Sequence, residues 1–151
     1  MPPKRIEWID RIREVEREFK AIHVGATRLL ADARNDPTIL ALEAIRPRDV
    51  ENAAARSEGT YIIRLFADFE TGLRSCWNSV RATDPPARTR DLIDGIAAMR
   101  QIPDSHRDSV HEVRDYRNAL VHERDEPINA IDIADARHRL CGFFSHLPLE
   151  W

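Results

Sequence analysis

Apolar side chains recur every three or four residues along most of this chain, which is the spacing of one face of an α-helix. The first such stripe predicts a long helix over residues 6–32 and consists of Ile6, Ile9, Ile12, Val15, Phe19, Ile22, Ala26 and Leu29. The second predicts a long helix over residues 50–81 and consists of Ile62, Leu65, Phe66, Phe69, Leu73, Trp77 and Val80.

Shorter helices are predicted in the rest of the chain. Residues 38–44 suit one or two helical turns. Three further helices are expected, one starting at Thr89 or Asp91 and ending before Pro103, one from Asp104 or Ser105 to His122, and one starting at Asn129 or Asp132. The alternation of polar and apolar residues that is typical of strands is missing from the sequence. The pattern therefore predicts an all-α fold, an up-and-down helical bundle of four to five helices.

Helix breakers and caps support these boundaries. Asn35-Asp36-Pro37 should end the first helix, and residues 83–87, which contain two prolines, form a loop. Asp49 is the expected N-cap of the second long helix. Gly72, near the middle of that helix, suits a close crossing with another helix.

The composition is that of a globular protein, with 42% hydrophobic and 32% charged residues in 151. This length suits a single domain spanning residues 1–151. No apolar run is long enough to cross a bilayer, and the N-terminus lacks the apolar core of a secretory signal, so a cytoplasmic location is expected. The net charge of −3 argues against loose binding to bulk nucleic acid but allows a small basic site.

Cysteine and histidine spacing gives no sign of a metal site. Cys76 and Cys141 are far apart in apolar helical settings and are expected to be free thiols. His106 and His111 are five residues apart and do not form a helical ligand pair. We therefore expect no structural metal and no cofactor.

The residues best suited to catalysis or ligand binding lie in the last turns of the predicted helix that ends at His122. There the sequence Arg-Asn-Ala-Leu-Val-His occupies residues 117–122. On an ideal helix Arg117 and His122 are roughly 140° apart around the axis and about 7.5 Å apart along it. Asn118 and His122 share a face.

These side chains suit the cleavage of RNA without a metal. A guanidinium binds phosphate through two parallel donors, and imidazole can accept or give a proton near neutral pH. His122 would remove the proton from a ribose 2′-hydroxyl or protonate the departing 5′-oxygen. Arg117 would stabilise the charge on the phosphate, and the Asn118 amide would orient either group.

Residues 117–122 resemble the Arg-x4-6-His signature of the HEPN superfamily, in which a polar Asn often follows the Arg. The resemblance implies a HEPN-like helical domain and a metal-independent endoribonuclease, with two protomers bringing both motifs into one cleft. It also implies a role as a toxin or phage-defence effector, with RNA as substrate and an antitoxin or neighbouring regulatory protein as a possible partner. One toxin branch has a modifiable Tyr two residues after the His, where this chain has Arg124.

Supporting roles fall to polar residues near the motif. Arg114 lies one turn before Arg117 and is a candidate for substrate binding, as is Asn118. From the second long helix, Arg64, Asp68 and Glu70 are candidates to face the Arg117 site, and Glu70 is the one that the resemblance favours.

Two other interpretations remain open. The domain could bind RNA, a nucleotide or another protein without cutting anything. Alternatively, the motif could be a chance occurrence in a structural helical domain, because arginine is abundant and six histidines are scattered along the chain. In that case Arg117 and His122 would both point to solvent.

Trp151, at the end of the given sequence, either packs back on the bundle or contacts a partner.

Overall fold

The computed structural model describes residues 1–122 and 128–151, and every regular element within those ranges is a helix. The helices are α1 (Arg5–Asn35), α2 (Thr38–Ala41), α3 (Pro47–Val80), α4 (Thr89–Arg100), α5 (Asp104–His122) and α6 (Ile133–Phe144). The all-α prediction is confirmed. The described ranges hold six helices rather than four to five, because the short apolar segment after α1 forms a separate turn, α2.

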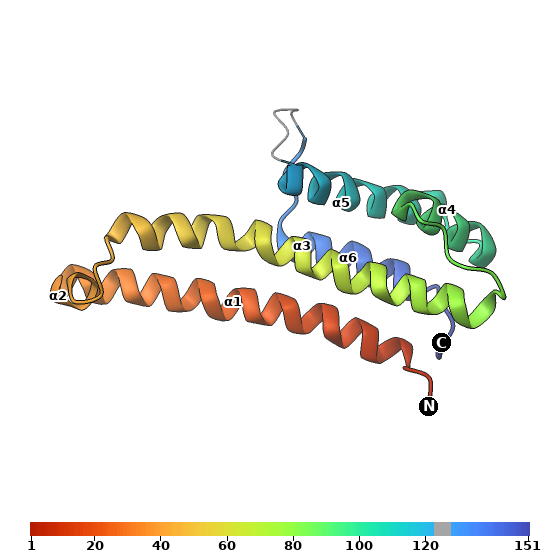
Figure 1. The fold of residues 1–151 in the computed structure, drawn as a ribbon, viewed down its shortest axis with the longest axis horizontal. Coiled ribbons are helices and arrows are strands. Elements are labelled where there is room, and N and C mark those ends of the chain that lie inside the picture. The colour runs from red at the N-terminus through yellow and green to blue at the C-terminus, as the bar shows by residue number, and fades with distance from the viewer. Residues whose placement is uncertain (123–127) are drawn as a thin grey trace.

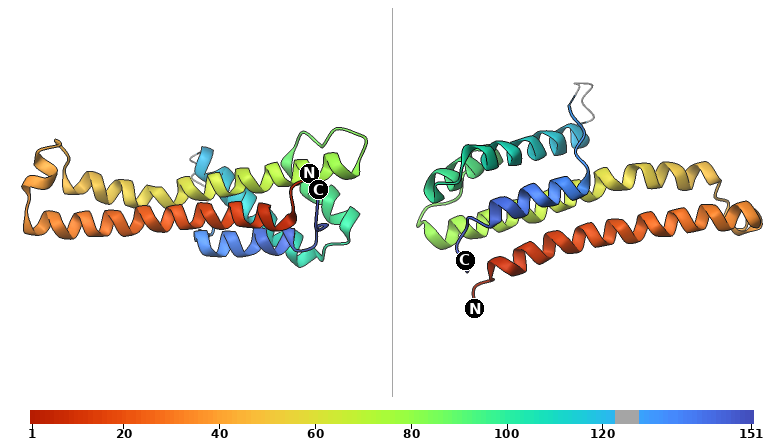
Figure 2. Two further views of the ribbon diagram at one scale, coloured as in Figure 1. Left: turned by 90° about the horizontal axis from the view of Figure 1, so that it is seen from below. Right: turned by 180° about the vertical axis from the view of Figure 1, so that it is seen from behind.

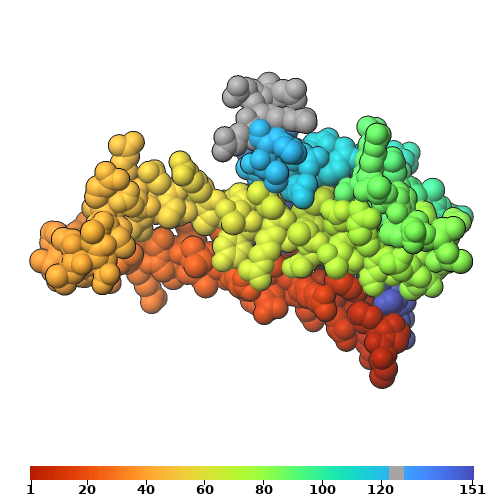
Figure 3. Space-filling model, in the orientation of Figure 1, coloured from red at the N-terminus to blue at the C-terminus, as the bar shows by residue number. Residues whose placement is uncertain are grey.

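Helices α1 and α3 form a long antiparallel hairpin whose tip is α2 (Figure 1). Helix α5 runs back along the second half of α3, and α6 packs against α1, α3 and α5. Helix α4 lies beside the end of α3 and touches the start of α5 (Figure 2). The tip of the hairpin extends beyond the part that α5 and α6 cover (Figures 1 and 3). The body of the molecule therefore consists of α4, α5 and α6 packed with the adjoining parts of α1 and α3, whereas the tip consists of the other ends of α1 and α3 joined by α2.

The face of α1 that enters the core differs from the predicted stripe near its start. Ile12 and Val15 are buried as expected, but Ile6 and Ile22 are about half exposed, and Trp8 is buried instead. The bulky Trp8 ring stacks in parallel on Trp151, with ring centroids 6.5 Å apart. This contact shows that Trp151 packs back on the bundle.

Helix α3 begins earlier than predicted, and Asp49 is not its N-cap. The helix starts at Pro47, where the missing N–H costs nothing, and the N-cap is Arg46. Asp49 lies three residues further on and accepts a hydrogen bond from the Arg46 backbone N–H at 2.9 Å. Its carboxylate also binds the Arg46 guanidinium. Asp49 thus stabilises the start of the helix from inside the first turn.

The centre of the core is an aromatic cluster at the crossing of α1, α3 and α6. It contains Phe66, Phe69, Phe143 and Phe144, all fully buried. Gly72 lies at this crossing, and a Cβ built on it would be 2.8 Å from the Phe144 ring. The Gly72 carbonyl also accepts a hydrogen bond from the Trp151 indole at 2.9 Å. The predicted close helix crossing at this glycine is therefore present.

A buried ion pair ties α1 to α6. Glu16 of α1 is only 5% exposed. It accepts a hydrogen bond from Arg137 of α6 at 2.8 Å and pairs with Lys20 at 3.0 Å. Burial alone would raise the pKa of Glu16, but the hydrogen bonds and charges of Lys20 and Arg137 outweigh it and lower the pKa below its ordinary value.

The helices within the described ranges include none that is both long enough and apolar enough to cross a membrane.

Candidate functional site

Arg117 is held inward on α5, at the level where α5 crosses α3. Its guanidinium carbon lies 5.8 Å from the centre of the Phe66 ring. One terminal nitrogen donates a hydrogen bond to the Asn118 side-chain oxygen at 2.9 Å. Its Nε is buried and has no hydrogen-bond partner within the described part of the chain. Arg117 is thus half-buried, with its Nε shielded from solvent and its terminal nitrogens beside a cavity.

A cavity of about 390 Å³ opens next to this guanidinium, between the start of α4 and the second half of α5. We call it the arginine pocket. Its lining consists of Phe66, Ala87, Arg88, Thr89, Arg90, Arg114, Arg117 and Asn118. Four of these eight residues are arginines, and none of these lining residues is acidic. The pocket therefore offers an anion several guanidinium groups at once.

Helix α4 presents its N-terminus to the pocket. Arg88 is the N-cap and makes no side-chain capping bond, so the first backbone N–H groups of α4 keep their positive character. Arg88 and Arg90 are both exposed. They bring the positive charge of the α4 start to the same cavity that the α5 arginines line.

Glu70 fixes the start of α4 rather than contacting Arg117. Its carboxylate accepts hydrogen bonds from Thr89 at 3.0 Å and from Arg74 at 2.8 Å. Arg74 in turn donates to the backbone carbonyl of Pro86 at 3.0 Å. Glu70 therefore does not line the pocket and instead holds Thr89 and, through Arg74, the loop before α4 in place.

A hydrogen-bonded chain that sequence analysis missed positions Arg114. His111 Nε2 lies 2.6 Å from the Asp94 carboxylate, and His111 Nδ1 lies 2.8 Å from an Arg114 terminal nitrogen. Arg114 also pairs with Asp115 at 2.6 Å. Because a guanidinium only donates, Nδ1 of His111 is the acceptor and Nε2 carries the proton. The i, i+3 spacing of His111 and Arg114 was a sequence signal for this contact, but Asp94 comes from α4 and could not be paired with them from spacing.

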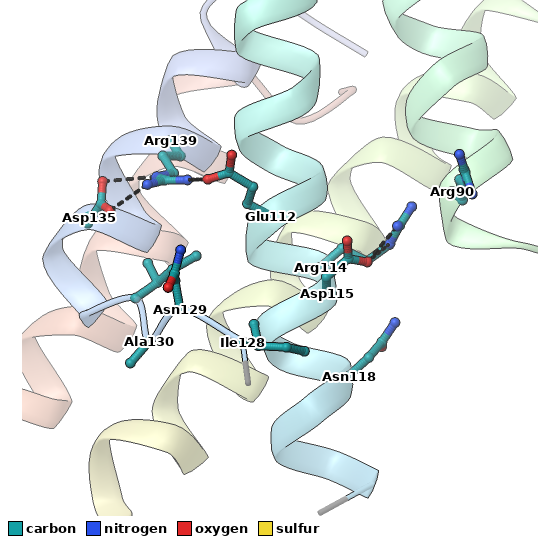
Figure 4. A pocket seen from close by; sticks show the side chains of 11 residues that line it. Arg90, Glu112, Arg114, Asp115, Asn118, Ile128, Asn129, Ala130, Asp135 and Arg139 are labelled. Atoms are coloured by element: carbon teal, nitrogen blue, oxygen red, sulfur yellow. Dashed lines mark hydrogen bonds and ion pairs between the residues drawn. The ribbon is translucent and has the colours of Figure 1, made fainter. Parts of the chain in front are cut away.

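A larger open groove adjoins the arginine pocket and shares Arg90, Arg114 and Asn118 with it (Figure 4). Its volume is about 730 Å³, and it extends across α5 toward the start of α6. On its far side Arg139 pairs with Asp135 and Glu112. Figure 4 shows Arg90 on α4 across from Arg114 and Asn118 on α5. On the pocket side Asp115 pairs with Arg114, and Arg90 makes no ion pair within the described ranges, whereas the α6 side is charge-balanced.

His122 is the last residue of α5 and is exposed. It lines neither the arginine pocket nor the adjoining groove. Within one protomer the structure therefore does not bring His122 and Arg117 into one cavity, consistent with the roughly 140° that separates them on a helix. The chance interpretation requires both side chains to point to solvent, but Arg117 is half-buried at a cavity and only His122 is exposed.

Two predicted neighbours of the motif lie elsewhere. Arg64 pairs with Glu18 of α1. Asp68 lies on the same side of α3, where burial raises the pKa of its carboxyl group and charges on α1 act on it. Both therefore face α1 and not Arg117. The comparison of Glu123 and Arg124 with the toxin branch concerns residues outside the described ranges.

The described ranges contain no group of three or more histidine, cysteine, aspartate or glutamate side chains that could hold a metal ion. Cys76 is buried, Cys141 is half-buried, and both are free thiols.

Comparison of the chain with protein-family models, with curated proteins and with solved structures finds no match.

Proposed function

We propose that this protein is a metal-independent endoribonuclease of the HEPN type, acting as a homodimer. The observation that supports this most is the arginine pocket, in which Arg117 of the Arg-x4-His motif lies half-buried beside three further arginines. His122 is exposed at the end of the same helix, where a substrate or a second protomer can reach it. A toxin or phage-defence role follows from the resemblance alone.

The reaction that these groups suit is an attack of a ribose 2′-hydroxyl on the adjacent phosphorus. The bond to the 5′-oxygen breaks, leaving a 2′,3′-cyclic phosphate on one product and a 5′-hydroxyl on the other. One imidazole takes the proton of the 2′-hydroxyl, and a protonated imidazole gives a proton to the departing 5′-oxygen. Arg117 and Arg114 stabilise the additional negative charge on the phosphate oxygens.

A dimer would supply what one protomer lacks. His122 of one copy lies outside the cavity that holds its own Arg117, so a second copy is needed to bring a histidine opposite that arginine. Two copies would also provide one imidazole as base and another as acid. Arg117 and His122 from two protomers would then be held in a fixed orientation around one phosphate, which lowers the entropic cost of the reaction.

The test is cleavage of mixed single-stranded and structured RNA by the purified protein with a chelator present. We expect products ending in a 2′,3′-cyclic phosphate. His122→Ala and Arg117→Ala should each reduce the rate by at least about a hundredfold. His23→Ala, which removes an exposed histidine from α1, is the matched control and should leave the rate unchanged. Equal activity of the wild type and His122→Ala would refute the proposal.

A second candidate is a phosphate-binding helical module that does not cleave RNA. It is favoured by one observation, that the residues lining the arginine pocket include no histidine. In this case RNA would bind and remain intact, and His122→Ala would bind as the wild type does. Induced expression separates the two in cells: toxicity that Arg117→Ala and His122→Ala both remove favours the nuclease, and toxicity unaffected by His122→Ala favours the module.

A further inference from the structure

The arginine pocket is built for more negative charge than one phosphodiester carries. Arg88 and Arg90 reach it from α4, and Arg114 and Arg117 reach it from α5. Within the described ranges Glu70 binds Thr89 and Arg74, and Asp115 neutralises Arg114, while Arg88, Arg90 and Arg117 make no ion pair. A ligand with two negative charges therefore balances this site better than a ligand with one.

The shape of the pocket favours a compact group with several acceptor oxygens. The guanidinium groups approach from two helices, and the α4 start, which has no side-chain capping bond, adds backbone N–H donors beside Arg88 and Arg90. A phosphodiester has two free oxygens, whereas a terminal phosphate has three, and each can accept charge-assisted hydrogen bonds. The volume of about 390 Å³ lies in the range of roughly 300–1,000 Å³ that small-molecule sites occupy.

The pocket is also connected to a path for a chain. The adjoining groove shares Arg90, Arg114 and Asn118 with it and leads away across α5. A group bound in the pocket can therefore be the end of a longer strand whose next nucleotides lie in the groove.

We infer that Arg88 and Arg90, on the α4 side of the arginine pocket, bind the terminal phosphate of a nucleic-acid strand, which leaves Arg114 and Arg117 on α5 for the diester of the proposed reaction. The inference rests on the proposed function for the nature of the strand, which is RNA. It adds that the protein selects strands by the chemical state of their end. A 5′-phosphate and a 3′-phosphate carry the same group, and the experiment distinguishes them.

The experiment measures binding of short fluorescent 2′-O-methyl RNA strands by anisotropy, with chelator present. These strands lack the 2′-hydroxyl, so they cannot be cleaved by the proposed reaction. Three strands of one sequence are compared, ending in a 5′-phosphate, in a 3′-phosphate or in hydroxyls only. We expect one of the phosphorylated strands to bind at least about tenfold more tightly than the hydroxyl strand, because the terminal phosphate adds charge-assisted hydrogen bonds. Inorganic phosphate should compete away this advantage.

The double variant Arg88→Gln/Arg90→Gln should lose the preference for the phosphorylated strand. Both side chains are exposed, so the variant should fold, and its thermal midpoint checks this. Arg28→Gln/Arg34→Gln removes the same charge from exposed positions of α1, near the hairpin tip, and should keep the preference. A preference that survives in Arg88→Gln/Arg90→Gln, or a loss of equal size in both double variants, would overturn the inference.

Equal affinity for all three strands would also overturn it, whatever the cleavage assay shows. Conversely, a protein that prefers the phosphorylated strand but cleaves no RNA would support the pocket and refute the nuclease. The two proposals therefore fail separately.

Discussion

Replacing Gly72 with alanine tests the central helix crossing most directly. The added Cβ would lie 2.8 Å from Phe144 Cζ and 3.1 Å from Trp8 Cε3. Carbon atoms in contact are normally about 3.5–4.0 Å apart, so both rings would have to move by several tenths of an ångström. Neither ring has room to do so, because Phe144 is fully buried between Phe69 and Trp151, and Trp8 is stacked on Trp151.

The expected size of the effect follows from two opposing contributions. Overpacking a tight core costs about 1–3 kcal/mol. Alanine is favoured over glycine within a helix by about 1 kcal/mol, which offsets part of that cost. Because both rings are confined, the upper part of the overpacking range, about 2–3 kcal/mol, applies. We therefore expect Gly72→Ala to lower the free energy of unfolding by about 1–2 kcal/mol.

Gly25→Ala is the matched control. Gly25 also lies inside a long helix, but a Cβ there meets nothing within 4 Å. Only the helix-propensity gain remains, so this variant should be more stable than the wild type by about 1 kcal/mol. Urea unfolding followed by circular dichroism measures both. A Gly72→Ala variant at least as stable as the wild type, alongside a stabilised Gly25→Ala, would refute this prediction. The helices would then be packed less tightly at Gly72 than the structure shows.

Three further predictions concern buried and titratable groups. Glu16→Gln should lower stability by about 1–2 kcal/mol at neutral pH, because a charge-assisted bond to Arg137 is lost. Since the pKa of Glu16 is lowered in the fold, this contribution is present above pH 4.5 and disappears as the pH falls further, so urea midpoints of variant and wild type should converge in acid. Burial and the neighbouring His106 lower the pKa of His146, so the protein should lose stability as the pH falls below 6.5. His146→Asn should reduce that loss in thermal melts, and an unchanged acid profile would contradict the assignment. Burial raises the pKa of the Cys76 thiol to about 11, so iodoacetamide should label it only after unfolding, which mass spectrometry can follow.

The helices were predictable from the sequence because their apolar periodicity is strong and their ends carry prolines and polar caps. Asp132, one of two predicted starts for the last helix, is its N-cap and accepts a hydrogen bond from Asp135 N–H at 2.7 Å. The exact buried face of α1 was not predictable. Ile6 and Trp8 are both strongly apolar, and the choice between them depends on Trp151, which lies at the far end of the chain.

The candidate site was only partly predictable, for a similar reason. Residues 117–122 pointed to Arg117, Asn118 and His122, and the structure places the first two at one cavity. Arg88 and Arg90 carry no local signal, since exposed arginines are common in this sequence. Their importance comes from the packing of α4 beside α5, which brings distant guanidinium groups together and which no spacing rule reveals.

The hairpin tip should unfold locally more easily than the body of the molecule. Around Ala33, Leu40 and Val50 it has its own small apolar cluster, separate from the main core, and α5 and α6 do not reach it. Opening the tip exposes little apolar surface and leaves the aromatic centre untouched, so the cost of opening should be well below that of global unfolding. Backbone amides there should exchange with deuterium well before those of the body, as a cooperative unit that melts first.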